Sequence, residues 1–79
     1  MHVNVRFFAV SREMVGAERQ MYTLPEDATL QDLQHQLFAA YPALEAQRVR
    51  FAVNLTYAPL TTVLHEGDEV ACIPPVGGG

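Results

Sequence analysis

The sequence predicts a two-layer α+β fold, in which one main helix packs on one face of a mixed β-sheet. Three observations lead to this prediction. Apolar and polar residues alternate near the start of the chain, as in a half-buried strand. Apolar residues at helical spacing follow in the middle, and a second alternating stretch lies near the end. With 79 residues, the chain has room for one domain and one thin hydrophobic core.

The first predicted elements are a strand, a short helix and a second strand. In residues 2–9 the apolar side chains at odd positions are expected to face the core, which leaves Phe8 outside. Ser11 is expected to cap one turn of helix that ends at Gly16, because glycine readily adopts a positive φ. Residues 20–24 alternate weakly and are expected to pair with the first strand as a hairpin.

The main helix is predicted to begin after Thr29. Thr29 and Asp32 have the spacing of a capping box, in which each side chain accepts a hydrogen bond from the other residue's backbone N–H. Apolar residues then recur every three or four positions, and Pro42 is expected to end the helix. The apolar stripe expected to lie on the sheet consists of Leu30, Leu33, Leu37, Ala40 and Tyr41.

Short elements are predicted after the main helix. Residues 50–54 are expected to form a strand with Phe51 and Val53 on one face, and residues 57–58 a brief strand after a turn. One turn of helix is expected over residues 61–64.

The last strand is predicted over residues 69–73, between the turn signal Gly67-Asp68 and the two prolines Pro74-Pro75. With this order of elements, the natural closure is a β-grasp, the ubiquitin-like fold, with the first and last strands parallel in the middle of the sheet. Residues 1–74 are therefore assigned to the β-grasp domain, and residues 75–79 to a flexible tail.

Composition excludes several classes of function. The net charge is −4 and the five arginines are scattered, so nucleic acid is not an expected partner. The chain has no lysine, so its carboxyl end could be joined to another protein but no side-chain amine could accept such a modifier. Cys72 is the sole cysteine, and alternation places it in the core as a small apolar residue. Three dispersed histidines offer no metal-ligand spacing, so no metal site is expected.

The longest apolar stretch is far short of the roughly 20 residues that cross a bilayer, and no signal-peptide core follows Met1. The chain is therefore expected to lie in the cytoplasm, without membrane contact. No nucleophile–base pair or phosphate-binding loop can be assembled, and no permanently bound cofactor is expected.

The informative segment is the end of the sequence, Pro74-Pro75-Val76-Gly77-Gly78-Gly79. Two prolines stop sheet pairing and direct the chain outward. The positions from Pro75 to Gly79 can reach about 16 to 18 Å, and glycines pass through a channel too narrow for side chains. The Gly79 carboxylate is therefore the expected reacting group.

Motifs over nearly the whole chain carry a resemblance to a known family. They are Phe7-Phe8-Ala9, Arg12-Glu13, Gly16, Val53-Asn54, Gly67-Asp68-Glu69-Val70-Ala71, Pro74-Pro75-Val76 and Gly78-Gly79. Together they resemble the small subunit of molybdopterin synthase, a relative of the thiamine sulfur carrier.

The resemblance implies a cycle of activation and sulfur transfer. A ubiquitin-activating-like adenylyltransferase uses ATP to adenylate the Gly79 carboxylate, and a sulfur-supplying desulfurase system provides the atom that replaces AMP. The thiocarboxylate, with Gly78 beside it, enters the large synthase subunit and gives sulfur to a cyclic pyranopterin precursor. The catalytic groups for transfer lie on that partner.

Alternation also predicts a partner surface near the tail. Phe8 and Ile73 are both expected outside, on neighbouring central strands. The residues expected to bind the large subunit are Phe8, Ile73, Pro74, Pro75, Val76 and Gly77. A structural alternative for Phe8 is that the helical turn over residues 11–15 covers it. Alternatives for the whole chain are a sulfur carrier for thiamine thiazole or another pathway, and a non-catalytic β-grasp interaction module.

Overall fold

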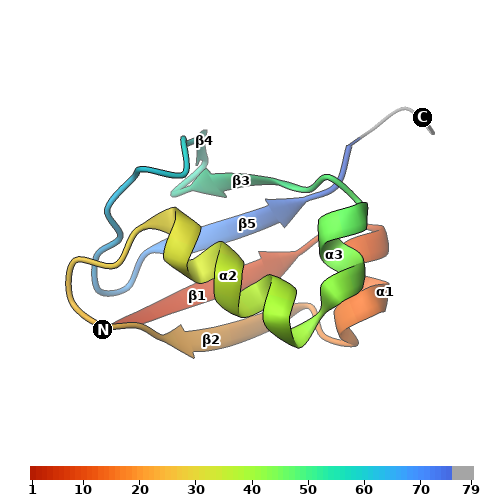
Figure 1. Cartoon of the computed structure of the whole chain (residues 1–79), viewed down its shortest axis with the longest axis horizontal. Helices are drawn as coiled ribbons and strands as arrows, with labels where there is room; N and C mark the ends of the chain where they lie inside the picture. Colours follow the sequence, from red (N-terminus) through yellow and green to blue (C-terminus); the bar gives the residue numbers. More distant parts are fainter. Residues whose placement is uncertain (76–79) are drawn as a thin grey trace.

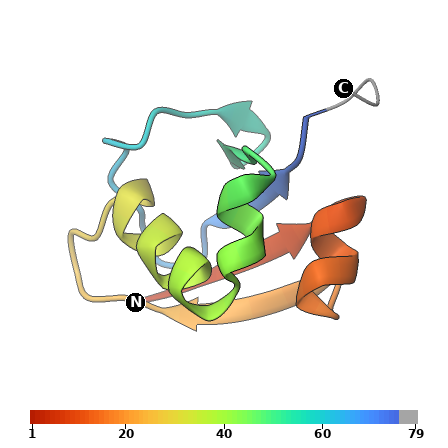
Figure 2. The same ribbon diagram turned by 45° about the vertical axis from the view of Figure 1, so that its right-hand side comes forward.

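The computed structural model describes residues 1–75 and contains a five-stranded mixed sheet in the order β2-β1-β5-β3-β4. The helices α2 and α3 lie on one face of this sheet, and α1 lies at the end where β1 and β5 finish (Figures 1 and 2). This arrangement confirms the predicted α+β class and β-grasp topology. No helix within the described part of the chain is long and apolar enough to span a bilayer.

The two central strands are the first and the last of the chain. β1 (His2–Phe7) and β5 (Glu69–Ile73) run parallel, with Asn4 opposite Glu69 and Phe7 opposite Cys72. β2 (Arg19–Thr23) pairs antiparallel with the outer side of β1. The odd side chains of β1 are buried, as predicted, but the strand ends at Phe7 and not at residue 9, because α1 already begins at residue 10.

The short helix α1 (Val10–Val15) ends at Gly16, whose φ of 79° and N–H bond to the Arg12 oxygen confirm the predicted stop. The prediction that Ser11 caps this helix is wrong. Ala9 is the N-cap, without any side-chain cap bond, and Ser11 lies inside the helix, fully buried. Its hydroxyl donates a 2.6 Å hydrogen bond back to the Phe8 oxygen, an alternative bond that serine can make inside a helix.

The main helix α2 (Leu30–Ala40) has the predicted capping box between Thr29 and Asp32. Its leucines at positions 30, 33 and 37 are buried, whereas the predicted stripe residue Ala40 is exposed and Tyr41 is partly buried. Pro42 does stop α2, but it also begins α3 (Pro42–Ala46), which the sequence did not predict. Proline suits the first position of a helix because its missing N–H has no intrahelical partner there.

The remaining strands are β3 (Arg50–Val53) and β4 (Thr56–Tyr57), each within a residue of its prediction. β3 pairs with both β4 and β5. The helical turn predicted over residues 61–64 is wrong. Thr61 lies in a turn closed by a bond from the Thr62 N–H to the Pro59 oxygen. Val63 then forms an isolated antiparallel bridge with Thr29, and the Leu64 N–H bonds to the Ala28 oxygen, so residues 62–64 run extended beside the start of α2.

Candidate functional site

The face of the sheet that points away from α2, here called the open face, carries a row of paired residues. Tyr57 lies opposite Ala52, Ala52 opposite Ala71, and Ala71 opposite Arg6. Directly opposed residues on adjacent strands project from the same face of a sheet. Two alanines thus lie between two larger side chains, which leaves a depression in the middle of the open face.

This depression is an apolar groove of about 550 Å³. Ala52 and Ala71 form its floor, and Phe8, Leu55, Tyr57 and Ile73 line its sides. A second hollow of about 400 Å³ shares Phe8, Leu55 and Ala71 with it, so the groove continues along the open face. A depression lined by apolar side chains on the surface of a small domain is typical of a site that binds another molecule.

Pro74 and Pro75 also line the groove, at the point where the chain leaves β5. The structure therefore brings together four of the residues predicted to bind a partner, namely Phe8, Ile73, Pro74 and Pro75. Pro74 is buried and Pro75 is exposed. The other predicted site residues, Val76, Gly77, Gly78 and Gly79, lie outside the described residues.

Phe8 and Ile73 differ in exposure. Phe8 is 39% exposed, so α1 does not cover it, and its N–H bonds to the Cys72 oxygen at 3.3 Å. The Arg6 guanidinium carbon lies 5.3 Å from the centre of the Phe8 ring. Ile73 is only partly exposed, a correction to the prediction that it is an exposed side chain. Because Arg50 lies opposite Ile73 on β3, part of this side chain is flanked by a neighbouring strand.

Sequence reasoning missed five groove residues as parts of a site, namely Ala9, Ala52, Leu55, Tyr57 and Ala71. Strand alternation contained the signal for Ala52, since Phe51 and Val53 were expected to point inward. The same alternation placed Ala71 outside, but an exposed alanine does not by itself indicate a site. Only the strand order shows that Ala71 lies beside Ala52 in the groove. Leu55 and Tyr57 required the geometry of the turn between β3 and β4.

One border of the groove is polar. The Glu69 carboxylate lies 3.8 Å from the Arg6 guanidinium and 3.3 Å from that of Arg19, and Arg6 is also 4.0 Å from the Glu18 carboxylate. All four side chains are at least 38% exposed, so these pairs add little to folding stability. An apolar centre with a charged border is the usual composition of a protein–protein interface.

Beneath the groove, Cys72 and Ser11 hold the end of β5 in place. Cys72 is fully buried, as predicted, and burial raises the pKa of its thiol to about 11. The thiol is therefore protonated at neutral pH and is a poor nucleophile. The Ser11 hydroxyl also lies 3.3 Å from the Cys72 oxygen, so α1 is tied to β5 just before the two prolines.

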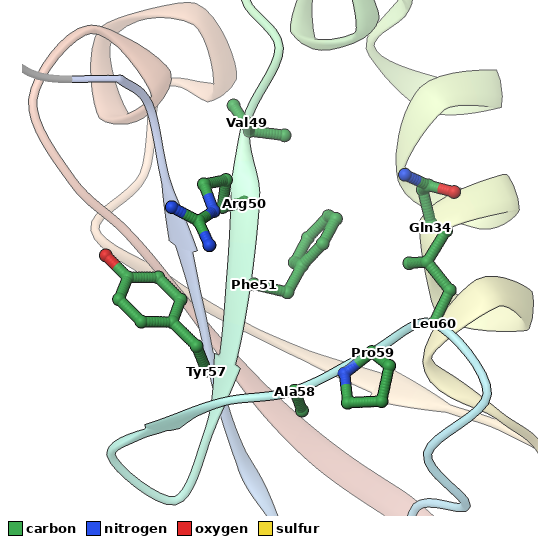
Figure 3. A pocket seen from close by; sticks show the side chains of 8 residues that line it. All are labelled: Gln34, Val49, Arg50, Phe51, Tyr57, Ala58, Pro59 and Leu60. Carbon is green, nitrogen blue, oxygen red and sulfur yellow. The ribbon is translucent and has the colours of Figure 1, made fainter.

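A separate hollow of about 320 Å³ lies at the edge of β3, between this strand and α2 (Figure 3). Phe51 points toward α2 and Gln34, whereas Arg50 and Tyr57 lie on the other side of β3 (Figure 3). The Arg50 guanidinium carbon is 4.6 Å from the centre of the Tyr57 ring, which orients Tyr57 at the groove wall. Within residues 1–75 no group of three or more His, Cys, Asp or Glu side chains could hold a metal ion.

Comparison of the sequence with known proteins shows full-length similarity. The model of the ThiS family matches residues 5–79. The chain is 41% identical over 83 residues to the molybdopterin synthase sulfur carrier subunit of Chlamydomonas reinhardtii, with 100% of both chains covered. It is 44% identical over 80 residues to the subunit of the same name from Mycobacterium tuberculosis, covering 98% of this chain and 96% of the relative.

Comparison of the structure shows the same fold in solved proteins. A putative molybdopterin converting factor, subunit 1, from Pyrococcus furiosus matches with a TM-score of 0.89 and 28% identity, over 96% of this chain and 99% of that one. A complex of subunits 1 and 2 of molybdopterin-converting factor from Helicobacter pylori contains a chain that matches with a TM-score of 0.70 and 27% identity, with 100% of both chains covered.

Proposed function

This chain belongs to the ThiS family, and from that premise we propose that it is the sulfur-carrying small subunit of a molybdopterin synthase. The observation that carries the proposal is the apolar groove at the root of the tail. The groove contains both Phe8 and the prolines after β5, so a protein that covers the open face also lies next to the point where residues 76–79 begin.

The reacting group in this proposal is the carboxylate of Gly79. A carboxylate is a poor electrophile, so an oxygen of Gly79 first attacks the α-phosphorus of ATP on an activating adenylyltransferase, and pyrophosphate leaves. Hydrosulfide, or its equivalent from a desulfurase system, then attacks the carbonyl carbon and AMP leaves. The resulting thiocarboxylate holds one sulfur atom in place of one oxygen atom.

The described part of the chain supports a carrier that holds the sulfur on its tail and leaves the catalytic groups to its partner. Its one thiol, that of Cys72, is buried with a raised pKa, so a side-chain persulfide on this residue is disfavoured. The groove has apolar walls and two alanines as its floor, which suits docking better than acid–base catalysis. The sulfur is therefore carried on the tail, and the groups that transfer it to a cyclic pyranopterin precursor belong to the larger partner.

Docking and transfer use different parts of the chain. The open face binds the large subunit, and the glycines of residues 77–79 enter its active site because a chain without Cβ atoms passes through a narrow channel. The relative from Helicobacter pylori is a complex of the two subunits, which supports a stable pair here also. Each delivery supplies one sulfur, so two deliveries complete the dithiolene of molybdopterin.

Mass spectrometry tests the first step. After incubation with the cognate activating enzyme, ATP and a sulfur source, the intact chain should gain the mass difference between sulfur and oxygen. A chain that ends at Gly77 serves as the control and should stay unchanged. A native chain that gains no mass under conditions that convert a known carrier contradicts the proposal.

A second measurement separates the pterin pathway from the thiamine alternative. The thiocarboxylated chain is mixed with the large subunit and the pyranopterin precursor, and in parallel with a thiazole synthase and its substrates. We expect sulfur in the pterin product alone. Transfer only to the thiazole would assign the chain to the thiamine pathway, and binding to partners without any transfer would identify it as an interaction module.

A further inference from the structure

The turn between β3 and β4 has a backbone that does not suit its sequence. Val53 pairs with Thr56, so Asn54 and Leu55 alone make the turn, with φ values of 49° and 73°. Two-residue turns with positive φ at both positions strongly favour Asn followed by Gly, because glycine has no Cβ to clash in the left-handed region. Asn54 fits this rule, and Leu55 occupies the position where glycine is favoured.

Leu55 gains nothing within the fold that would offset this strain. It is 100% exposed, so its side chain contributes no burial to the stability of the chain. The other non-glycine residues with positive φ in residues 1–75 are Ala9, Asp27, Arg48 and Asn54, which are small or polar. Leu55 is thus the one large apolar side chain that the described backbone holds in a strained conformation and in water.

The turn that presents Leu55 is anchored firmly to β5. The Asn54 amide nitrogen donates a 3.0 Å hydrogen bond to the Asp68 carboxylate, and its amide oxygen accepts one of 3.0 Å from the Glu69 N–H. The backbone N–H of Asn54 donates a 2.8 Å bond to the Glu69 oxygen. Because these bonds fix the turn, little backbone freedom remains for Leu55 to lose when it makes a contact.

The place of Leu55 indicates what it contacts. It lines both hollows of the open face, and one of them also contains Pro74 and Pro75. The four residues after Pro75 span at most about 13 to 14 Å. A protein that receives Gly79 in its active site must therefore lie close to the groove, within reach of Leu55.

We propose that Leu55 is a preorganised anchor that inserts into an apolar pocket of the large subunit when that protein covers the open face. The inference rests on the proposed function and adds a specificity-determining residue to it. The strain at Leu55 is retained because a rigid apolar projection beside the groove fixes the register in which the two proteins dock. Correct register aligns the start of the tail with the entrance of the partner's active site.

Two substitutions separate this role from a structural one. Leu55→Gly removes the side chain and the strain together, and Leu55→Asn removes the apolar contact but keeps a residue that tolerates positive φ. Each full-length variant is titrated into the purified large subunit by calorimetry, and its thermal midpoint is measured alone. Val63→Ala, at an exposed valine paired with Thr29 and outside the groove, is the matched control.

For both Leu55 variants we expect affinity to fall about tenfold or more, the loss typical of an interface hot spot, with an equal or higher thermal midpoint. Val63→Ala should change neither quantity. Affinity within twofold of the native value for Leu55→Gly overturns the inference. If Leu55→Gly binds normally but Phe8→Ala binds more weakly, only the anchor role of Leu55 is refuted. If Phe8→Ala also binds normally, the assignment of the open face as the docking surface is refuted too.

Discussion

Replacing Phe8 by alanine tests the docking face most directly, and the size of its effect follows from the structure. Phe8 is 39% exposed, and a phenylalanine buries about 200 Å² when fully covered, so roughly 80 Å² remain for a partner to cover. At about 25 cal/mol per Å², this area contributes about 2 kcal/mol to binding. The dissociation constant for the large subunit should therefore rise about 30-fold.

The buried part of Phe8 also contributes to the fold, so binding and stability have to be measured separately. Calorimetric titration at 25 °C gives the affinity, and circular dichroism with a thermal scan shows that the variant is folded at that temperature. Val63→Ala is again the control, because Val63 is 44% exposed but lies outside the groove. A folded Phe8→Ala variant whose affinity changes less than about threefold refutes the assignment of this face.

Three further predictions concern the framework of the site. Thr29→Ala removes the capping box of α2 and should lower the thermal midpoint by about 5 °C in a scanning measurement, without changing the affinity for the large subunit. Burial raises the pKa of the Cys72 thiol to about 11, so this thiol should not react with a thiol reagent at pH 8 until urea unfolds the chain. Rapid reaction of the native protein would contradict the burial of Cys72. Hydrogen bonds from Thr29, first from its backbone N–H and second from its side chain, lower the pKa of the Asp32 carboxyl group. The stabilisation by the Asp32 carboxylate is therefore present above the pKa of the unfolded chain and is lost as pH falls through the lowered pKa of the folded chain. Asp32→Asn should therefore be less stable than the native chain at pH 7, and the difference should shrink as pH falls below about 4 and vanish only below the lowered pKa of Asp32; a difference independent of pH would exclude this origin.

The parts of the fold that depend on periodicity could be predicted from the sequence. Alternation in residues 2–9 and 69–73 predicted the two central strands, the first of which ends at Phe7 in the structure, and the order of elements then implied their parallel pairing. Thr29 and Asp32 marked the start of α2 because a capping box has a fixed spacing. The expectation that Phe8 and Ile73 lie near each other, close to the tail, followed from the same two patterns, and both residues line the groove.

The errors arose where a residue type suits two local structures. Serine can cap a helix or bond back to a preceding carbonyl from inside it, and the burial of Ser11 against β5 selects the second role. Pro42 ends one helix and begins the next, a choice that depends on Leu44 finding a place in the core. Residues 62–64 run extended because the pairing of Val63 with Thr29 outweighs a weak local preference for helix.

The groove was only half predictable because it depends on strand order. Alanines at positions 52 and 71 do not indicate a groove from the sequence alone. They form its floor only because β3 and β5 are neighbours and place the two side chains side by side. Leu55 gave no signal in the sequence, since its importance comes from a positive φ in the turn and from full exposure.

Genetic complementation tests the central proposal, that a tail beyond the docking face carries the sulfur. Cells that lack their own small subunit are supplied with the native chain or with a version that ends at Gly77, and molybdopterin is measured in both. We expect molybdopterin only with the native chain, while the shortened protein keeps the native thermal midpoint and binds the large subunit normally. Equal molybdopterin from the shortened version would show that Gly78 and Gly79 do not carry the sulfur.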